Sequence, residues 1–135
     1  MKTFNLTIFT PNGKKYDQDV EFVQVHTEEA YLGILPNHAD LISDVMVSKL
    51  TIRINGVDED FAVGEGVLNV KDGNLKLVVD SLEHSSEIDL ERAMAAKQRA
   101  LDRLNGALVD FEELDIVRAK AALVRALNRI NVSQK

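Results

Sequence analysis

The chain has 135 residues, and its content of 45% hydrophobic and 28% charged residues is typical of a globular protein. The formal net charge of -6 argues against a nucleic-acid partner, because contacts to phosphates require a basic surface. The absence of cysteine excludes disulfides, thiol catalysis and cysteine-ligated metals, and it fits a reducing cytoplasm.

Residues 1–84 are expected to form a β-sheet domain, because apolar and polar residues alternate along them. In "TFNLTIF" the side chains of Phe4, Leu6 and Ile8 fall on one face, and "PNG" follows as a turn. Segments with a similar pattern predict further strands at 20–26, 47–54, 57–63, 66–70 and 75–79. "NG" at 55–56 and "DG" at 72–73 are typical hairpin turns. Many short strands with close turns predict an antiparallel β-sandwich or flattened barrel.

Residues 85–135 are expected to form a second, helical domain. Asn105-Gly106 predicts the end of a first helix, and Asp110 or Asp115 is the candidate cap of a second. Apolar stripes at helical spacing occur in both segments: Leu90, Met94, Leu101, Leu104 and Leu108 in the first, and Leu123, Leu127 and Ile130 in the second. The short connection predicts an antiparallel two-helix hairpin.

The stretch "SEIDLERA" at 86–93 has two interpretations. Ser86 precedes Asp89 by three residues, as in a capping box, so the stretch predicts a helix start. It also places Glu83, Asp89 and Arg92 near one helix end, where they can hold a small charged ligand. The residues alone support the cap and leave the binding site open.

Arginines repeat with one spacing in the two helical segments. Arg92, Arg99 and Arg103 lie on one helical face, and Arg118, Arg125 and Arg129 repeat the pattern. Small residues lie beside each row and allow the helices to approach: Ala93, Ala96 and Ala100 in the first, and Ala119, Ala122 and Ala126 in the second. A solvated charged face is the plainer interpretation. Arginine, however, suits bidentate contacts to phosphate or carboxylate better than lysine does.

No catalytic or metal-binding motif stands out. His26, His38 and His84 are scattered, and the chain has neither an HExxH motif nor a Gly-rich phosphate loop. His38 and Asp40 in "NHAD" have the spacing of a turn rather than of a metal site. We therefore expect a non-catalytic interaction protein that needs no metal.

Four motifs in order, "YLGILPNHADLI", "AVGEGVLNV", "EIDLERAMAAKQRA" and "RALNRINVS", together resemble the epsilon subunits of bacterial F-type ATP synthases. The resemblance implies a β-sandwich at 1–84, seated on the central stalk, and a mobile regulatory hairpin at 85–135. It implies a rotor subunit that couples proton translocation to ATP synthesis without catalysing it. The extended hairpin inhibits ATP hydrolysis by obstructing rotation.

The resemblance also implies that ATP is a regulatory ligand of the folded hairpin. Ile88, Asp89, Arg92 and Ala93 match the family's I/L-D-x-x-R-A motif. The remaining contacts implied by the family fall on Glu83, Arg99 and Arg125, and Arg118 and Arg129 are further candidates. A ligand that binds only the folded hairpin at a hundredfold excess over its Kd stabilises it by about 2.7 kcal/mol.

The implied partners are the gamma subunit, the c-ring and the alpha and beta subunits. The implied stalk and rotor-ring contacts fall on Tyr31, Leu32, Gly33, Pro36 and His38. No apolar run approaches the roughly 20 residues that span a bilayer, so any membrane association is expected to be through another protein. The resemblance implies a peripheral protein on the cytoplasmic face of the bacterial cell membrane, attached only through the complex.

The sequence departs from the family pattern at three places, one of which is Glu65 in "VGEG" at 63–66, where a small residue is common. Tyr31 follows Glu29-Ala30 where the family has an acidic "GELGI" turn, so an aromatic contact is expected there. His84 stands where arginine is frequent, which adds a group that titrates near neutral pH beside Glu83. Two other functions stay open on the residues: a freestanding nucleotide sensor without a stalk role, and a β-sandwich adaptor with a charged helical tail.

Overall fold

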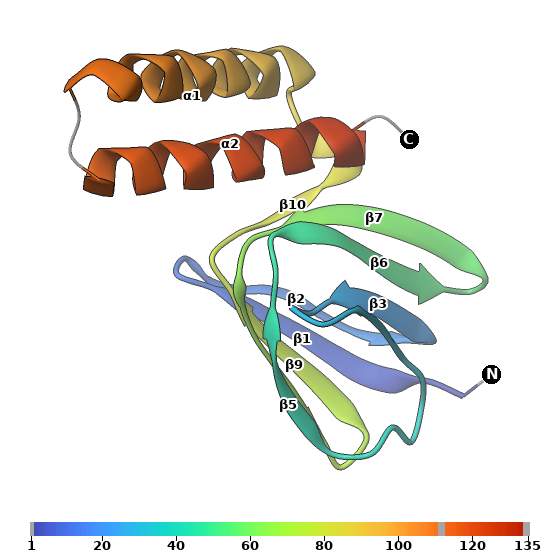
Figure 1. The fold of residues 1–135 in the computed structure, drawn as a ribbon. Coiled ribbons are helices and arrows are strands. Elements are labelled where there is room, and N and C mark those ends of the chain that lie inside the picture. The colour runs from blue at the N-terminus through green and yellow to red at the C-terminus, as the bar shows by residue number, and fades with distance from the viewer. Residues whose placement is uncertain (1, 111–112, 134–135) are drawn as a thin grey trace. The chain divides into compact units, whose positions relative to one another are not determined.

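The computed structural model describes residues 2–110 and 113–133, and the contacts divide the chain into two compact units, Met1–His84 and Ser85–Lys135 (Figure 1). The first unit is built of strands and the second of helices. Each unit has its own internal packing, so the two are described separately.

The first unit is a β-sandwich of two five-stranded sheets. One sheet has the order β2-β1-β9-β8-β5 and the other the order β10-β7-β6-β3-β4. The strands are β1 (Phe4–Thr10), β2 (Gly13–Val20), β3 (Phe22–His26), β4 (Tyr31–Ile34), β5 (Leu41–Val45), β6 (Ser48–Ile54), β7 (Val57–Val63), β8 (Gly66–Lys71), β9 (Asn74–Val79) and β10 (Leu82–His84). The pairs are antiparallel except for β1 and β9, which run parallel.

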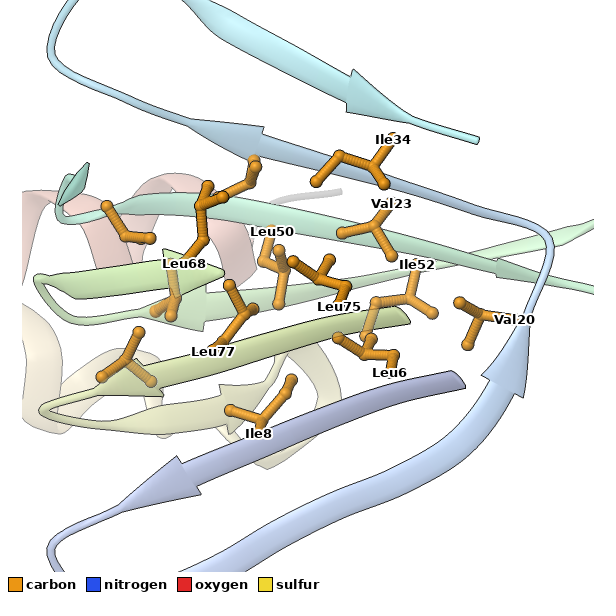
Figure 2. Packing of buried hydrophobic residues seen from close by; sticks show 14 of the residues in the cluster. Leu6, Ile8, Val20, Val23, Ile34, Leu50, Ile52, Leu68, Leu75 and Leu77 are labelled. Atoms are coloured by element: carbon orange, nitrogen blue, oxygen red, sulfur yellow. The ribbon is translucent and has the colours of Figure 1, made fainter. Parts of the chain in front are cut away.

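Alternate residues of the strands form one apolar core between the sheets. Leu6 and Ile8 of β1 are fully buried, and so are Leu75 and Leu77 of β9 beside them. Figure 2 shows these side chains converging with those of the facing sheet, which include Leu50 of β6. Burial of a side chain of this size stabilises a fold by about 1.5–3 kcal/mol. The core therefore accounts for the period-two pattern that predicts the strands.

The predicted sandwich is confirmed, and four strands add to the predicted set. β2, β4, β5 and β10 give little signal in the sequence because they lie at sheet edges. Most side chains of β2 are exposed, so its sequence "GKKYDQDV" does not alternate. The predicted strand at 20–26 is divided at Glu21, where the chain passes from one sheet to the other.

Two predicted hairpin turns are confirmed by the backbone. Asn55 and Gly56 have φ angles of 51° and 75°, and Asp72 and Gly73 have φ angles of 52° and 81°. Consecutive positive φ angles are the mark of a type I′ turn, whose twist matches that of the flanking strands. These turns join β6 to β7 and β8 to β9.

The second unit is an antiparallel hairpin of two helices that pack side by side (Figure 1). A short 3₁₀ helix, η1 (Ser85–Glu87), precedes α1 (Leu90–Asp110), and α2 (Glu113–Ser133) follows. The helix end predicted at Asn105-Gly106 is wrong, because α1 continues to Asp110. A glycine inside a helix costs only about 1 kcal/mol, and packing along a long helix offsets it. Asp115 is not a cap either, because α2 begins before it.

Gly66 is a position where the sandwich tolerates no side chain. A Cβ atom there would overlap the carbonyl oxygen of Val78 and lie 2.7 Å from the Cα atom of Val79, both backbone atoms of β9. We expect Gly66→Ala to lower the free energy of unfolding by about 3 kcal/mol or more, because β8 and β9 must separate. Urea denaturation measures this loss.

The matched control is Val67→Ala on the next residue, whose side chain is 49% exposed. It is expected to change the free energy of unfolding by no more than about 0.5 kcal/mol. Equal stability of the wild type and Gly66→Ala would contradict the prediction, because it would show that β8 and β9 can accommodate a Cβ atom at residue 66.

Candidate functional site

The "EIDLERA" stretch begins helix α1, and Asp89 is its cap. The Arg92 backbone N–H donates to the Asp89 side-chain Oδ1 at 3.1 Å, and the Ala93 N–H donates to the Asp89 carbonyl at 3.0 Å. Both bonds are those of an N-cap residue. The expected capping by Ser86 is wrong, because Ser86 lies in η1, three residues before the cap position. Asp89 thereby fixes where the first turn of α1 begins.

A row of alanines on each helix forms the contact between α1 and α2. Ala93 and Ala100 in α1, and Ala119 and Ala126 in α2, are no more than 4% exposed. Residues seven apart lie on the same helical face. These four side chains define the alanine seam of the hairpin, where the short side chains let the two backbones come close.

The apolar stripes predicted from the sequence lie beside this seam and are only partly covered. Met94 is 54% exposed and Leu127 is 44% exposed. Leu101 and Leu123 are half-buried. The alanines of the seam are therefore more fully buried than the residues of these stripes, and Val132 near the end of α2 is a larger apolar residue that is buried as well.

The two arginine rows lie on the same side of the hairpin. On each helix the arginines lie about 90° to one side of the seam alanines, and the leucines lie to the other side. Because the helices are antiparallel, packing alanine row against alanine row brings both arginine rows to one face. This arginine face consists of Arg92, Arg99 and Arg103 from α1, and Arg118, Arg125 and Arg129 from α2.

The arginine face carries more positive charge than the described residues neutralise. Five of its members, all except Arg129, are exposed and have no carboxylate within ion-pair distance among the described side chains. Like charges held on one face repel one another, and guanidinium groups bind phosphate or carboxylate in bidentate geometry. The face is therefore suited to bind a multivalent anion.

The predicted ATP contacts divide between the ends of the hairpin. The open end, where α1 begins and α2 ends, holds Ile88, Asp89, Arg92 and Ala93, together with Arg129 of α2. Arg99 is nine residues from the start of α1 and Arg125 is eight residues from the end of α2, so both lie between the ends, and Arg118 lies toward the closed end, near the connection of the helices. Glu83 belongs to the sandwich unit, where it pairs with Ala62 of β7.

His84, the other residue beside the predicted site, makes its contacts within the sandwich. Its Nε2 atom lies 3.2 Å from Oε2 of Glu59, and its ring meets that of Phe61 edge-on with centroids 5.0 Å apart. The Tyr16 ring of β2 also meets the Phe61 ring edge-on, with centroids 6.0 Å apart. Burial, followed by the charge of Glu59, raises the pKa of the Tyr16 phenol. Sequence reasoning missed this cluster because its members come from three distant strands.

The predicted partner contacts lie on and after β4. Tyr31 is 54% exposed and stacks on His26 with ring centroids 4.3 Å apart. Leu32 faces inward and packs against the core, and Gly33 approaches the ring of Phe22 closely. Of the predicted contacts, Tyr31 therefore lies on the outer face of β4 and Pro36 and His38 in the turn that follows it, whereas Leu32 packs inward.

The turn after β4 lines a shallow groove. Pro36 contributes to an open groove of about 570 Å³ whose other lining residues are Lys2, Glu21, Phe22, Leu35, Asn37, Arg53 and Gly56. Leu35 is 57% exposed, and the Arg53 guanidinium lies over the Phe22 ring. The backbone N–H of His38 donates a hydrogen bond to the Leu35 carbonyl at 3.2 Å and closes the turn. Leu35 and Phe22 were not predicted as contacts, although Leu35 lies within the "YLGILPNHADLI" motif and Phe22 within the strand predicted at 20–26.

The described residues contain no group of three or more histidine, aspartate or glutamate side chains that can hold a metal ion. Nor does either helix, over its described residues, have an apolar stretch long enough to cross a membrane.

Comparison with known proteins accounts for both units. Residues 3–85 match the β-sandwich domain of the ATP synthase delta/epsilon chain, and residues 86–134 match the long alpha-helix domain of the same chain. The chain belongs to the ATP synthase delta/epsilon family. The boundary between the two matched domains coincides within a residue with the boundary between the sandwich and the helical hairpin.

Bacterial members of the delta/epsilon family are similar along most of the chain. The ATP synthase epsilon chain of Bacillus licheniformis is 39% identical over 112 residues, covering 83% of this chain and 86% of its own length. That of Bacillus subtilis is 39% identical over 105 residues, covering 78% and 80%. The fold is shared with a chain of the Euglena gracilis mitochondrial ATP synthase at a TM-score of 0.80 and 18% identity, covering 93% of this chain and 78% of that one.

The alanine seam leads to a prediction about the stability of the helical unit. We expect Ala126→Leu to lower the stability of the helical unit by about 1–3 kcal/mol, because the larger side chain pushes the helices apart. Circular dichroism during urea denaturation measures the loss of helix. Ala121→Leu, at an exposed position of the same helix, is the control and is expected to have little effect. Equal losses in the two variants would contradict the seam.

Proposed function

We propose that the chain is the epsilon subunit of a bacterial ATP synthase, a non-catalytic subunit of the central stalk at the cytoplasmic face of the cell membrane. The match of both units to the delta/epsilon family, with Bacillus epsilon chains as relatives, carries the proposal. The similar folds come from ATP synthase structures described as "OSCP/F1/c-ring" and "central stalk/cring". The proposed partners are gamma, the c-ring, and the alpha and beta subunits.

In this proposal the sandwich connects the subunit to the rotor, and the hairpin regulates ATP hydrolysis. Residues 1–84 seat the subunit on gamma and the c-ring through the face and turn formed by Tyr31 to His38. Residues 85–135 move between a folded hairpin and an extended state that obstructs rotation and so inhibits ATP hydrolysis. The alanine seam supports a hairpin that can open, because separating small side chains exposes little apolar surface.

ATP binding at the open end of the arginine face would stabilise the folded hairpin. Arg92 from α1, with Arg125 and Arg129 from α2, provide the positive charge for the phosphates. Ile88 and Ala93 offer apolar contact to the adenine ring. A ligand that contacts both helices favours the folded hairpin, because it cannot keep its contacts to both helices once they separate. High ATP would hold the inhibitor in its folded state, and ATP depletion would release it.

Calorimetric titration tests the ATP site. We expect the full chain to bind one ATP at the open end, and Arg92→Ala or Arg125→Ala to weaken binding at least about tenfold, because each removes a charge-assisted contact to phosphate. Lys120→Ala is the control, since Lys120 is an exposed cation of α2 that points away from the arginine face. Absence of binding at millimolar ATP would refute the sensor role.

Hydrolysis by the assembled enzyme tests the inhibitory role. An F1 complex reconstituted with residues 1–84 is expected to hydrolyse ATP faster than one with the whole chain, most clearly at low ATP. Co-purification of gamma with residues 1–84 serves as the control for assembly. Equal rates in two fully assembled complexes would remove the inhibitory role, and failure of the whole chain to bind gamma would favour a freestanding sensor.

A further inference from the structure

Asparagine followed by glycine is a chemically reactive pair, and the chain contains it at 12–13, 55–56 and 105–106. The backbone nitrogen of the glycine attacks the side-chain carbonyl carbon of the asparagine and expels ammonia, which leaves a cyclic succinimide. Water then opens the ring to aspartate or isoaspartate, so water is the only other reactant. Glycine favours the reaction because it has no side chain to obstruct the attack. Each pair is therefore a candidate site of spontaneous deamidation.

Two of the pairs are restrained only by backbone structure. Asn105 and Gly106 lie within α1, where each backbone N–H is bonded to a carbonyl of the preceding turn. Asn12 and Gly13 lie at the turn between β1 and β2, where Gly13 pairs with Thr10. Among the hydrogen bonds of the described residues, no side chain accepts from the N–H of either glycine.

The pair at 55–56 differs, because the Gly56 N–H donates to a carboxylate. The acceptor is Oε1 of Glu21 at 3.0 Å, and Glu21 lies where the chain passes from one sheet to the other. The backbone N–H of Glu21 donates to the Arg53 carbonyl at 2.9 Å. Two hydrogen bonds thus tie Glu21 to the β6–β7 hairpin and hold its carboxylate against the turn that contains Asn55.

The bond from Gly56 to Glu21 opposes succinimide formation in two ways. The nucleophile is the deprotonated amide nitrogen, and a carboxylate that accepts a hydrogen bond from the N–H favours the protonated amide. The bond also fixes the peptide group between Asn55 and Gly56, whose nitrogen must turn toward the Asn55 side chain for the attack. Both effects slow the same step, although Asn55 and Gly56 are exposed to solvent.

Deamidation at this turn would alter the β6–β7 hairpin and the groove beside it. Isoaspartate adds a methylene group to the backbone, and a two-residue type I′ turn does not accommodate a longer backbone. Arg53 and Asp58, which form an ion pair at 2.7 Å, are opposite each other on the strands next to the turn. Gly56 and Arg53 also line the groove to which Pro36 contributes.

We propose that Asn55–Gly56 is a latent deamidation site and that Glu21 protects it. Glu21 acts as a positioning residue, because it holds the backbone nitrogen that would otherwise become the nucleophile. The protection resides in the sandwich unit and requires neither a partner nor a nucleotide.

Incubation of the full chain at mildly alkaline pH, followed by peptide mapping with mass spectrometry, tests the protection. We expect Glu21→Ala to increase the deamidation rate at Asn55 at least about fivefold, because a bond to a charged acceptor is lost. The rate at Asn12 in the same sample is expected to stay unchanged, which also shows that the sandwich remains folded. Glu29→Ala removes an exposed carboxylate outside the β6–β7 hairpin and is expected to change neither rate.

Hydrogen exchange of the Gly56 amide, measured by NMR, is an independent test, because base-catalysed exchange passes through the same deprotonated nitrogen. The exchange is expected to become faster in Glu21→Ala. An unchanged deamidation rate at Asn55 in this variant, or unchanged exchange at Gly56, would overturn the proposal. Equal increases at Asn55 and Asn12 would also overturn it, because they would indicate general loosening of the sandwich rather than loss of one bond.

Discussion

The alanine contact between α1 and α2 is the interaction on which the rest of the helical unit depends. Ala93 and Ala126 at one end, and Ala100 and Ala119 further along, let two antiparallel helices pack through small side chains. That packing fixes the rotation of both helices. The two arginine rows therefore lie on one face because of how the helices pack, and this cannot be seen from either helix alone.

The same contact makes the hairpin responsive to a ligand. An alanine buries about one methyl group, whereas each leucine of the sandwich core contributes roughly 1.5–3 kcal/mol. The sandwich thus buries many large apolar side chains, among them Leu6, Leu75 and Leu77. The helical hairpin buries mainly small ones. A binding free energy of a few kcal/mol is small for the first unit and decisive for the second. In the proposed mechanism, this difference in side-chain size makes the sandwich the stable part of the subunit and the hairpin the part that switches.

Much of the fold could be predicted from the sequence because burial leaves a periodic pattern. Strands such as β1 and β6, with one buried face, alternate clearly, whereas the exposed edge strand β2 has no pattern to find. The helix start in "SEIDLERA" was predicted, and Asp89 caps it, but the end predicted at Gly106 was wrong because α1 continues to Asp110.

The candidate site was predictable in part for the same reason. Helical spacing placed each arginine row on one face of its own helix, but convergence of the rows required the helix partner. The placement of His84 against Glu59 and Phe61 depends on pairing of β10 with β7, which the sequence does not encode locally. Contacts between strands that are distant in the sequence could therefore not be predicted from the sequence.

The distance between the helix ends as a function of ATP tests the central claim most directly. The chain has no native cysteine, so spin labels can be attached at two introduced cysteines, Glu91→Cys in α1 and Asn131→Cys in α2, both at exposed positions near the open end. A folded hairpin held by ATP predicts a broad distance distribution without nucleotide that narrows to one short distance at saturation. A distribution that is the same with and without saturating ATP would contradict the account.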